Sequence, residues 1–207
     1  MRDAWLVADA TPTRRDERAS AVVFVVGAAA LMWLVEIVDS IDHHDLDQYG
    51  IRPRQFDRLI GIVTAPFLHA SFGHLESNTI PFLVLGLGIA LGGLARVLAV
   101  TAIVMVIGGL GVWLVAPANS VHIGASGIVF GYASYLISRG LFDRSALELA
   151  MGAIVVAIWG GALLSSLVPQ DHISWQGHLF GAVGGVVAAA ALARRPQQDA
   201  DQAPGGL

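Results

Sequence analysis

The fold is decided by apolar stretches such as residues 97–115, VLAVTAIVMVIGGLGVWLV, which carry no charged side chain. A run of this length matches the roughly 20 apolar residues that a helix needs to cross the hydrocarbon core of a bilayer. Including this one, we expect membrane spans at residues 19–38, 75–94, 97–115, 125–138, 147–168 and 173–192, of which the fourth is short. The sequence therefore predicts an all-α membrane protein built as a bundle of six transmembrane helices.

The composition of the 207-residue chain agrees with a membrane location. Only 14% of the residues are charged, against about 25% in soluble domains, and 55% are hydrophobic. The 12 basic residues are all arginine and are scattered along the chain, so the basic stripe of a nucleic-acid-binding protein is missing and we expect no nucleic-acid partner. Because the chain has no cysteine, thiol nucleophiles, disulfides and Cys-bound metals are excluded.

The positions of the arginines predict the orientation in the membrane, because short cytoplasmic loops collect basic residues. Arginines that would share one side of a six-span chain are Arg14, Arg15, Arg18, Arg96, Arg139, Arg144, Arg194 and Arg195. We assign that side, with both termini, to the cytoplasm and expect a plasma-membrane protein. Its three parts would be a cytoplasmic segment at 1–18, the membrane domain at 19–193 and a disordered cytoplasmic tail at 194–207.

The first outer loop, residues 39–73, is longer than a passive connection needs to be. Its apolar segment at 59–68 is interrupted by Gly61 and Pro66, which predicts a partly embedded element that does not span the bilayer. His43 and His44 lie beside several aspartates in this loop and are more simply a solvated run than a metal site. The H-E-x-x-H zinc motif is absent from the sequence. We therefore expect neither a metal nor another cofactor.

Polar side chains inside the expected spans gather at one depth. His74 and Asn78 begin the second span, Ser126 begins the fourth and His178 lies near the start of the sixth, all within roughly 8 Å of the outer ends. Such groups are costly in a span unless they are paired, so their coincidence in one layer indicates a site. Glycines repeat every four residues beside Ser126 and beside His178, which would allow these two helices to approach closely.

A serine next to a histidine is the arrangement of a hydroxyl nucleophile with its general base. Ser126 would lie in the first turn of its helix, where unpaired N–H groups stabilise an oxyanion, and Asn78 could add a donor. Taken singly, each residue has a plainer explanation. G-x-S-G occurs by chance in a Gly-rich chain, His178 could be a packed histidine, and Asn78 could join two helices. Their shared depth favours catalysis.

Three motifs resemble those of the rhomboid family of intramembrane serine proteases. HASFGHLESN at 69–78, GASG at 124–127 and GHLFG at 177–181 are similar to the family's H-x-x-x-x-H-x-x-x-N, G-x-S-G and G-H-x-x-G in order and spacing. The resemblance implies Ser126 as nucleophile, His178 as base, and an oxyanion and substrate site that includes His74, Asn78, Gly124 and Phe130. Phe130 stands where the family often has a tyrosine that stacks on the base, and the Trp-Arg pair frequent in the family's first loop is not evident.

The resemblance also implies the activity, which is hydrolysis of a peptide bond in or near a transmembrane segment of another membrane protein. The site would open to the outer side of the lipid bilayer, and the fifth span with residues 169–172 would gate lateral access of the substrate. Two alternatives stay open: an inactive rhomboid-like protein that binds membrane helices, and a small polytopic transporter. The sequence does not reveal the oligomeric state or the natural substrate.

Overall fold

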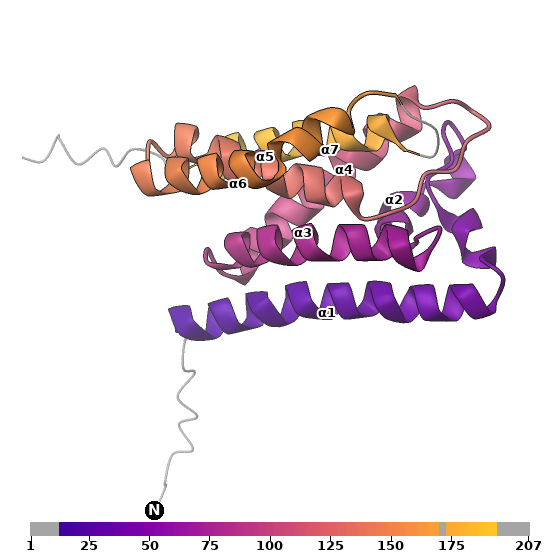
Figure 1. The fold of residues 1–207 in the computed structure, drawn as a ribbon, viewed down its shortest axis with the longest axis horizontal. Coiled ribbons are helices and arrows are strands. Elements are labelled where there is room, and N and C mark those ends of the chain that lie inside the picture. The colour runs from indigo at the N-terminus through magenta and orange to yellow at the C-terminus, as the bar shows by residue number, and fades with distance from the viewer. Residues whose placement is uncertain (1–12, 170–172, 194–207) are drawn as a thin grey trace, which may run out of the picture.

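The computed structural model describes residues 13–169 and 173–193, and within these ranges the chain is helical without a strand. The elements in order are α1 (Arg14–Ile41), η1 (Asp45–Tyr49), η2 (Phe56–Arg58), α2 (Gly61–Thr64), η3 (Ala65–Phe67), α3 (Phe72–Ala90), α4 (Leu94–Val115), α5 (Ser126–Phe142), α6 (Ala146–Ser165) and α7 (Trp175–Ala191) (Figure 1). Residues 1–12 of the expected cytoplasmic segment, the expected tail at 194–207 and residues 170–172 of the expected gate lie outside the described residues.

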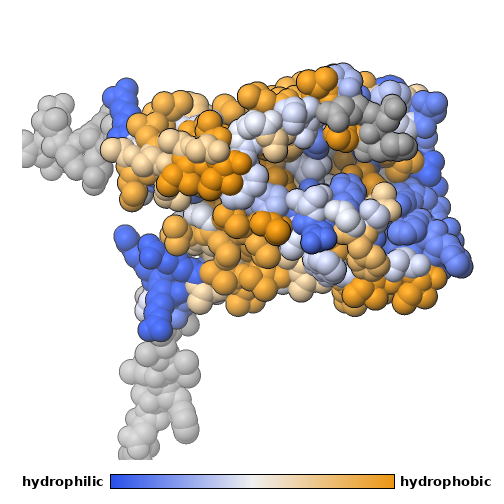
Figure 2. Space-filling view, in the orientation of Figure 1, coloured by the Kyte–Doolittle hydropathy of each residue, from blue (hydrophilic) through white to orange (hydrophobic). Residues whose placement is uncertain are grey.

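Three of the described helices, α1, α4 and α6, are long and apolar enough to cross a membrane. Beside them lie α3 with 19 residues and α5 and α7 with 17 residues each, and all six run roughly along one direction (Figure 1). Figure 2 shows apolar side chains over the flank of this bundle and hydrophilic ones gathered toward its two ends. The expectation of an all-α membrane protein is thereby confirmed.

Several helix ends differ from the predicted ones. α1 begins at Arg14 rather than at residue 19, because Thr13 and Asp16 form a capping box that starts the helix before its apolar run. The predicted end of the fourth span at residue 138 was wrong, since α5 continues to Phe142, but with 17 residues α5 is still, together with α7, the shortest of the six long helices described. Near that end Arg139 pairs with Asp143 at 3.3 Å and with Glu148 at 2.6 Å. These two carboxylates compensate the charge of the largely buried Arg139 side chain.

A glycine seam joins α5 to α7 and consists of Gly127 and Gly131 on α5 with Gly181 and Gly185 on α7. A methyl group added at Gly181 would overlap the carbonyl oxygen of Gly127, and one added at Gly185 would overlap that of Gly131. Because no side chain separates the two backbones here, the helices approach as closely as the repeat of small residues predicted. The seam sets the distance between side chains that α5 and α7 carry.

The loop between α1 and α3 is tied to the segment that precedes α5. Ile51 and His122 exchange backbone hydrogen bonds of 2.9 and 3.0 Å, and the Gly124 N–H donates to the carbonyl oxygen of Ala65 at 2.9 Å. The apolar segment at 59–68 folds into the short helices α2 and η3 rather than a span, with Ala65 buried. The loop thus fixes the backbone just ahead of Ser126.

Candidate active site

Ser126 and His178 meet between α5 and α7, although they lie 52 positions apart in the sequence. The Nε2 atom of His178 is 2.9 Å from the Oγ atom of Ser126, and its Nδ1 atom is 2.8 Å from the backbone carbonyl oxygen of Ser166. A carbonyl oxygen can only accept a hydrogen bond, so we assign the ring proton to Nδ1, which leaves Nε2 to accept from the hydroxyl. The contact predicted from the shared depth of these residues is therefore present.

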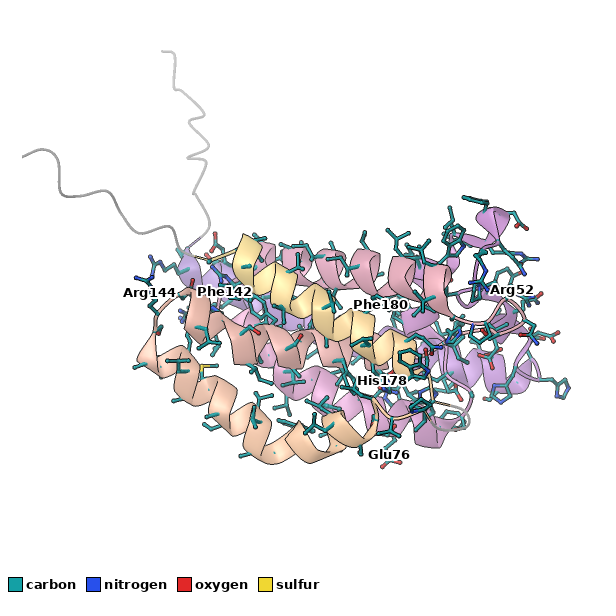
Figure 3. All side chains as sticks on the ribbon, turned by 90° about the horizontal axis from the view of Figure 1, so that it is seen from above. Arg52, Glu76, Phe142, Arg144, His178 and Phe180 are labelled. Atoms are coloured by element: carbon teal, nitrogen blue, oxygen red, sulfur yellow. The ribbon has the colours of Figure 1, made fainter. Side chains whose placement is uncertain are left out.

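Figure 3 shows where His178 lies along the bundle. His178 is near the end that carries Arg52 and Glu76, and far from Phe142 and Arg144 at the other end. Glu76 is exposed, as expected for a residue at the start of its helix. The pair therefore lies toward one end of the bundle, because the Ser126 hydroxyl is 2.9 Å from the His178 ring.

The Phe130 ring stacks on the imidazole ring of His178 and fixes its orientation. The two ring centroids are 4.1 Å apart and the planes differ by 3°, so the rings are stacked. Both side chains are buried. Since Phe130 lies one turn after Ser126 on α5, the same helix supplies the hydroxyl and the surface on which the imidazole rests, and the missing tyrosine hydroxyl does not prevent stacking.

The N-terminus of α5 lacks the side-chain cap that four of the other long helices have. Thr13, Ser71, Ser145 and Ser174 each accept a backbone N–H in the first turn of α1, α3, α6 and α7. Ala125 takes the corresponding position before α5 and provides no such oxygen. Because the first N–H groups of a helix have no partner within the helix, those beside Ser126 can bind a developing oxyanion.

Gly124, His69 and His74 shape the turn that leads into Ser126. Gly124 has φ +109°, and a Cβ atom there would lie 2.7 Å from the His74 ring, so glycine is required both by conformation and by space. His69 is fully buried, accepts the Ala125 N–H at 3.3 Å and packs edge-on against His74 with 5.1 Å between ring centroids. Burial, and then the neighbouring His74, lowers the pKa of His69 to about 4, so its ring stays neutral and able to accept.

Asn78 is buried one turn beyond His74 on α3, but its amide is partly engaged. Its Nδ2 atom donates to the carbonyl oxygen of His74 at 2.9 Å. One N–H of this amide is thus used within the helix, and only the other is left for a ligand. The structure therefore groups Ser126, His178, His74, Gly124 and Phe130 by direct contacts, while Asn78 contacts this group through His74.

A cavity of about 50 Å³ lies beside Ser126 and brings a second serine–histidine pair close to it. Its lining includes Ser126, His122 and Ser174. The Nδ1 atom of His122 is 2.7 Å from the Oγ atom of Ser174, and its Nε2 atom is 2.8 Å from the Oγ atom of Ser120. The Ser120 hydroxyl donates to a backbone carbonyl at 2.6 Å, which assigns the His122 ring proton to Nε2.

Sequence reasoning missed three of these groups. His69 is the first residue of the motif at 69–78, but the sequence pattern gave it no role. His122 lies in a loop, outside the spans in which polar residues stand out. The Ser166 carbonyl has no sequence signal, because any residue at the end of α6 supplies the same oxygen. Burial lowers the pKa of His122, so it too stays neutral.

Comparisons with known proteins agree with the motifs. Residues 56–195 match the Rhomboid domain family. An uncharacterized protein of Mycobacterium tuberculosis is 46% identical over 168 residues, which cover 77% of this chain and 70% of that protein. The Bacillus subtilis protein named "Putative rhomboid protease YdcA" is 29% identical over 174 residues, or 79% of this chain and 84% of that protein. The chloroplastic Rhomboid-like protein 11 of Arabidopsis thaliana is 33% identical over 167 residues, or 68% and 55%. No solved structure matches the chain.

Proposed function

The chain belongs to the rhomboid family, and we propose that it is an intramembrane serine protease in which Ser126 is the nucleophile and His178 the general base. The observation that carries the proposal is the 2.9 Å contact between the Ser126 hydroxyl and Nε2 of His178 at the uncapped start of α5. A hydroxyl is a weak nucleophile unless a base takes its proton, and this contact supplies that base.

In the proposed first step, the Ser126 oxygen attacks the carbonyl carbon of the scissile peptide bond while its proton moves to Nε2 of His178. The resulting imidazolium keeps its Nδ1–H on the Ser166 carbonyl oxygen, which takes the orienting place that an aspartate has in a triad. The imidazolium then gives its proton to the leaving amine. Water, activated by the same histidine, hydrolyses the acyl-enzyme and restores the Ser126 hydroxyl.

The negative oxygen of the tetrahedral intermediate would be stabilised by the free N–H groups of the first turn of α5. We assign further roles to the His74 ring, which lies against Gly124, and to the second N–H of the Asn78 amide. Removing one donor of such a site typically lowers kcat by about 10²–10³-fold. These assignments follow the resemblance and are supported by the position of the two side chains near Ser126.

We further propose that all six long helices span the plasma membrane, with both termini in the cytoplasm and the site open to the outer side. The membrane domain would be residues 19–193, and the partners would be lipid and the transmembrane segments of other proteins. Substrate segments should contain glycine or other weak helix formers near the cut, because a helical backbone cannot enter the site extended.

Cleavage of a reporter tests this proposal. The full chain, purified in detergent or reconstituted into vesicles, is given a membrane protein with a Gly-containing transmembrane segment, and fragments are followed over time. We expect cleavage by the wild-type chain and its loss in Ser126→Ala and in His178→Ala. Ser134→Ala is the control on the same helix, since this hydroxyl donates only to backbone carbonyls at 2.8 and 3.1 Å. Cleavage that persists in both dyad variants would refute the dyad.

A further inference from the structure

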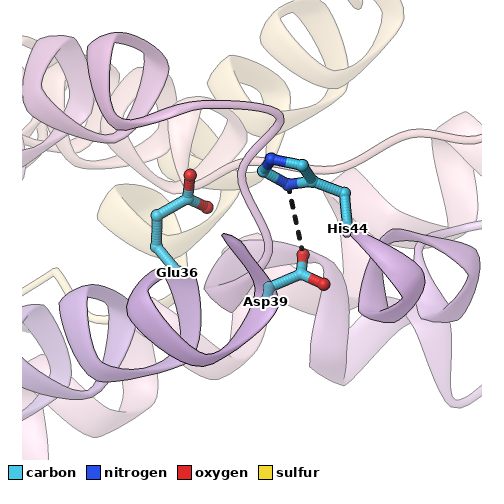
Figure 4. A group of neighbouring side chains, drawn as sticks. All are labelled: Glu36, Asp39 and His44. Carbon is cyan, nitrogen blue, oxygen red and sulfur yellow. Dashed lines mark ion pairs between the residues drawn. The ribbon is translucent and has the colours of Figure 1, made fainter. Parts of the chain in front are cut away.

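We propose that the end of α1 and the turn after it form a divalent-cation site with Glu36, Asp39 and His44 as ligands. One ligand atom from each of the three side chains lies within 4.8 Å of the others. Glu36 and Asp39 are three residues apart and share one face of α1, and Figure 4 shows His44 turned back toward both carboxylates. The proposal uses none of the residues assigned to catalysis and does not depend on the proposed protease activity.

The two carboxylates are buried and lack partners that would compensate their charge. Glu36 and Asp39 are both 0% exposed. Among the residues that the structure describes, neither carboxylate oxygen of Glu36 accepts a hydrogen bond, and Oδ2 of Asp39 accepts none either. The last turn of α1 has no basic residue. A buried carboxylate without a partner is costly, and two adjacent ones repel each other, so the ionised pair needs a nearby positive charge, whereas without one a carboxyl takes up a proton.

His44 by itself is a poor source of that charge, but it is a suitable ligand. Its Nδ1 atom is 3.7 Å from Oδ2 of Asp39, beyond hydrogen-bond length, and its side chain is 40% exposed. Two ligand atoms that are each about 2.1 Å from one tetrahedral ion lie roughly 3.4 Å apart, so the observed distance needs only a small adjustment. The exposed imidazole also leaves a route for an ion from solvent.

The backbone holds Asp39 so that one oxygen is left for the ion. Its Oδ1 atom accepts the Leu46 N–H at 2.8 Å, and its carbonyl oxygen accepts the His44 N–H at 2.8 Å. These bonds fix the carboxylate and the turn around it, while Oδ2 faces the cluster. Metal ligands are commonly oriented in this way by a hydrogen bond on the atom that does not bind the metal.

Asp47 adds a third carboxyl beside the site. Its Oδ1 atom is buried and has no hydrogen-bond partner in the described part of the chain. Carboxylates combined with one imidazole suit Mn²⁺ or Zn²⁺. A dication would neutralise Glu36 and Asp39 together.

This proposal departs from the expectation that the first loop holds no metal. That expectation considered His43 and His44 with the exposed Asp45 and interpreted them as a solvated run. Glu36 belongs to the expected preceding span and Asp39 begins the expected loop, so the sequence alone did not group the two carboxylates with His44. The turn after α1 makes that grouping, with φ values of +58° at His43 and +65° at His44.

Metal titration of the purified full-length chain tests the site. Metals are first removed with a chelator, and binding of Mn²⁺ and of Zn²⁺ is then measured by calorimetry in detergent. We expect one equivalent to bind, with Kd weakened at least about tenfold by Glu36→Gln and by His44→Asn. Asparagine is chosen at position 44 because it tolerates the left-handed backbone. Asp42→Asn and His43→Asn are the matched controls, since both side chains are exposed on the same turn.

Thermal unfolding provides a second readout. The bound cation should raise Tm of the wild-type chain and of both controls, but not of Glu36→Gln or His44→Asn. Should Glu36→Gln fail to fold, His44→Asn still decides the matter, because it alters an exposed side chain. The proposal is overturned if the wild-type chain binds neither ion, or if His44→Asn binds as tightly as His43→Asn. Neither measurement uses proteolysis, so failure here is distinct from failure of the proposed function.

Discussion

Two serine–histidine pairs lie at the same end of the bundle, and they differ in what surrounds the serine. The Ser126–His178 distance is 2.9 Å and the Ser174–His122 distance is 2.7 Å, so distance alone would favour the second pair. However, the Ser174 oxygen also accepts the N–H of Gly177 and caps α7. Ser126 instead begins a helix that has no side-chain cap.

The difference indicates that a short contact with histidine is not enough to mark a nucleophile. A serine at an uncapped helix start has free N–H groups beside it for the oxyanion, whereas the oxygen of a capping serine already accepts one of these N–H groups. The supports of the two histidines differ as well. His178 is held by a backbone carbonyl and a stacked ring, while His122 is held by another hydroxyl. We therefore treat Ser126 and His178 as catalytic and Ser174 and His122 as structural.

The largest expected contrast comes from replacing each histidine. His178→Ala should lower kcat for reporter cleavage by about 10³-fold or more, because the proposed base is lost. His122→Ala should lower it by at most about tenfold, through loosening of the loop before α5. Steady-state cleavage of the same reporter by both variants measures the contrast, and a larger loss in His122→Ala would reverse the assignment of the two pairs.

The next contrast concerns the glycine seam that brings Ser126 to His178. Gly181→Ala should destabilise the fold by about 2–3 kcal/mol and reduce cleavage, since the added methyl group would overlap the Gly127 carbonyl oxygen. Gly161→Ala on α6 is the matched control, because a methyl group there meets nothing within 4 Å. Denaturant unfolding in detergent compares the two, and equal stability of both variants would contradict the close approach of α5 and α7.

Acid should weaken the region around Ser126 through His69. Its pKa is lowered to about 4 in the folded chain, so the unfolded chain, with a histidine pKa of about 6.5, binds the proton first. The neutral, buried His69 therefore contributes fully to the free energy of unfolding above pH 6.5. This contribution falls as the pH falls toward 4, and about 1–2 kcal/mol of it is lost at pH 5. In melting curves, Tm should fall less between pH 7 and pH 5 for His69→Gln than for the wild-type chain. The exposed His43→Gln is the control and should follow the wild type.

The smallest contrast is at Phe130. Phe130→Leu removes the stacked ring from His178 and should lower kcat by about 2- to 10-fold, the size of an aromatic stacking contribution. Phe130→Tyr keeps the ring and should retain activity close to the wild-type value. An equal loss in both variants would mean that packing volume, rather than stacking, governs this position.

Much of the fold and the central contact could be predicted from the sequence, because both follow from local patterns. Apolar runs located the helices, and the depth of Ser126 and His178 together with their neighbouring glycines predicted that the two would touch. The length of α5 could not be predicted in this way, since it is accompanied by ion pairs of Arg139 with residues on both sides of a turn. The role of the Ser166 carbonyl could not be predicted either, because its position depends on where α6 ends and not on a residue type.

The identity of the reactive serine is the most direct test of the central claim. The wild-type chain is treated with a fluorophosphonate, digested, and searched by mass spectrometry for the modified peptide, with Ser126→Ala treated in parallel. We expect a single adduct on Ser126 and none in Ser126→Ala. An adduct on Ser174, or labelling that is undiminished in Ser126→Ala, would contradict the assignment of Ser126 and His178 as the catalytic pair.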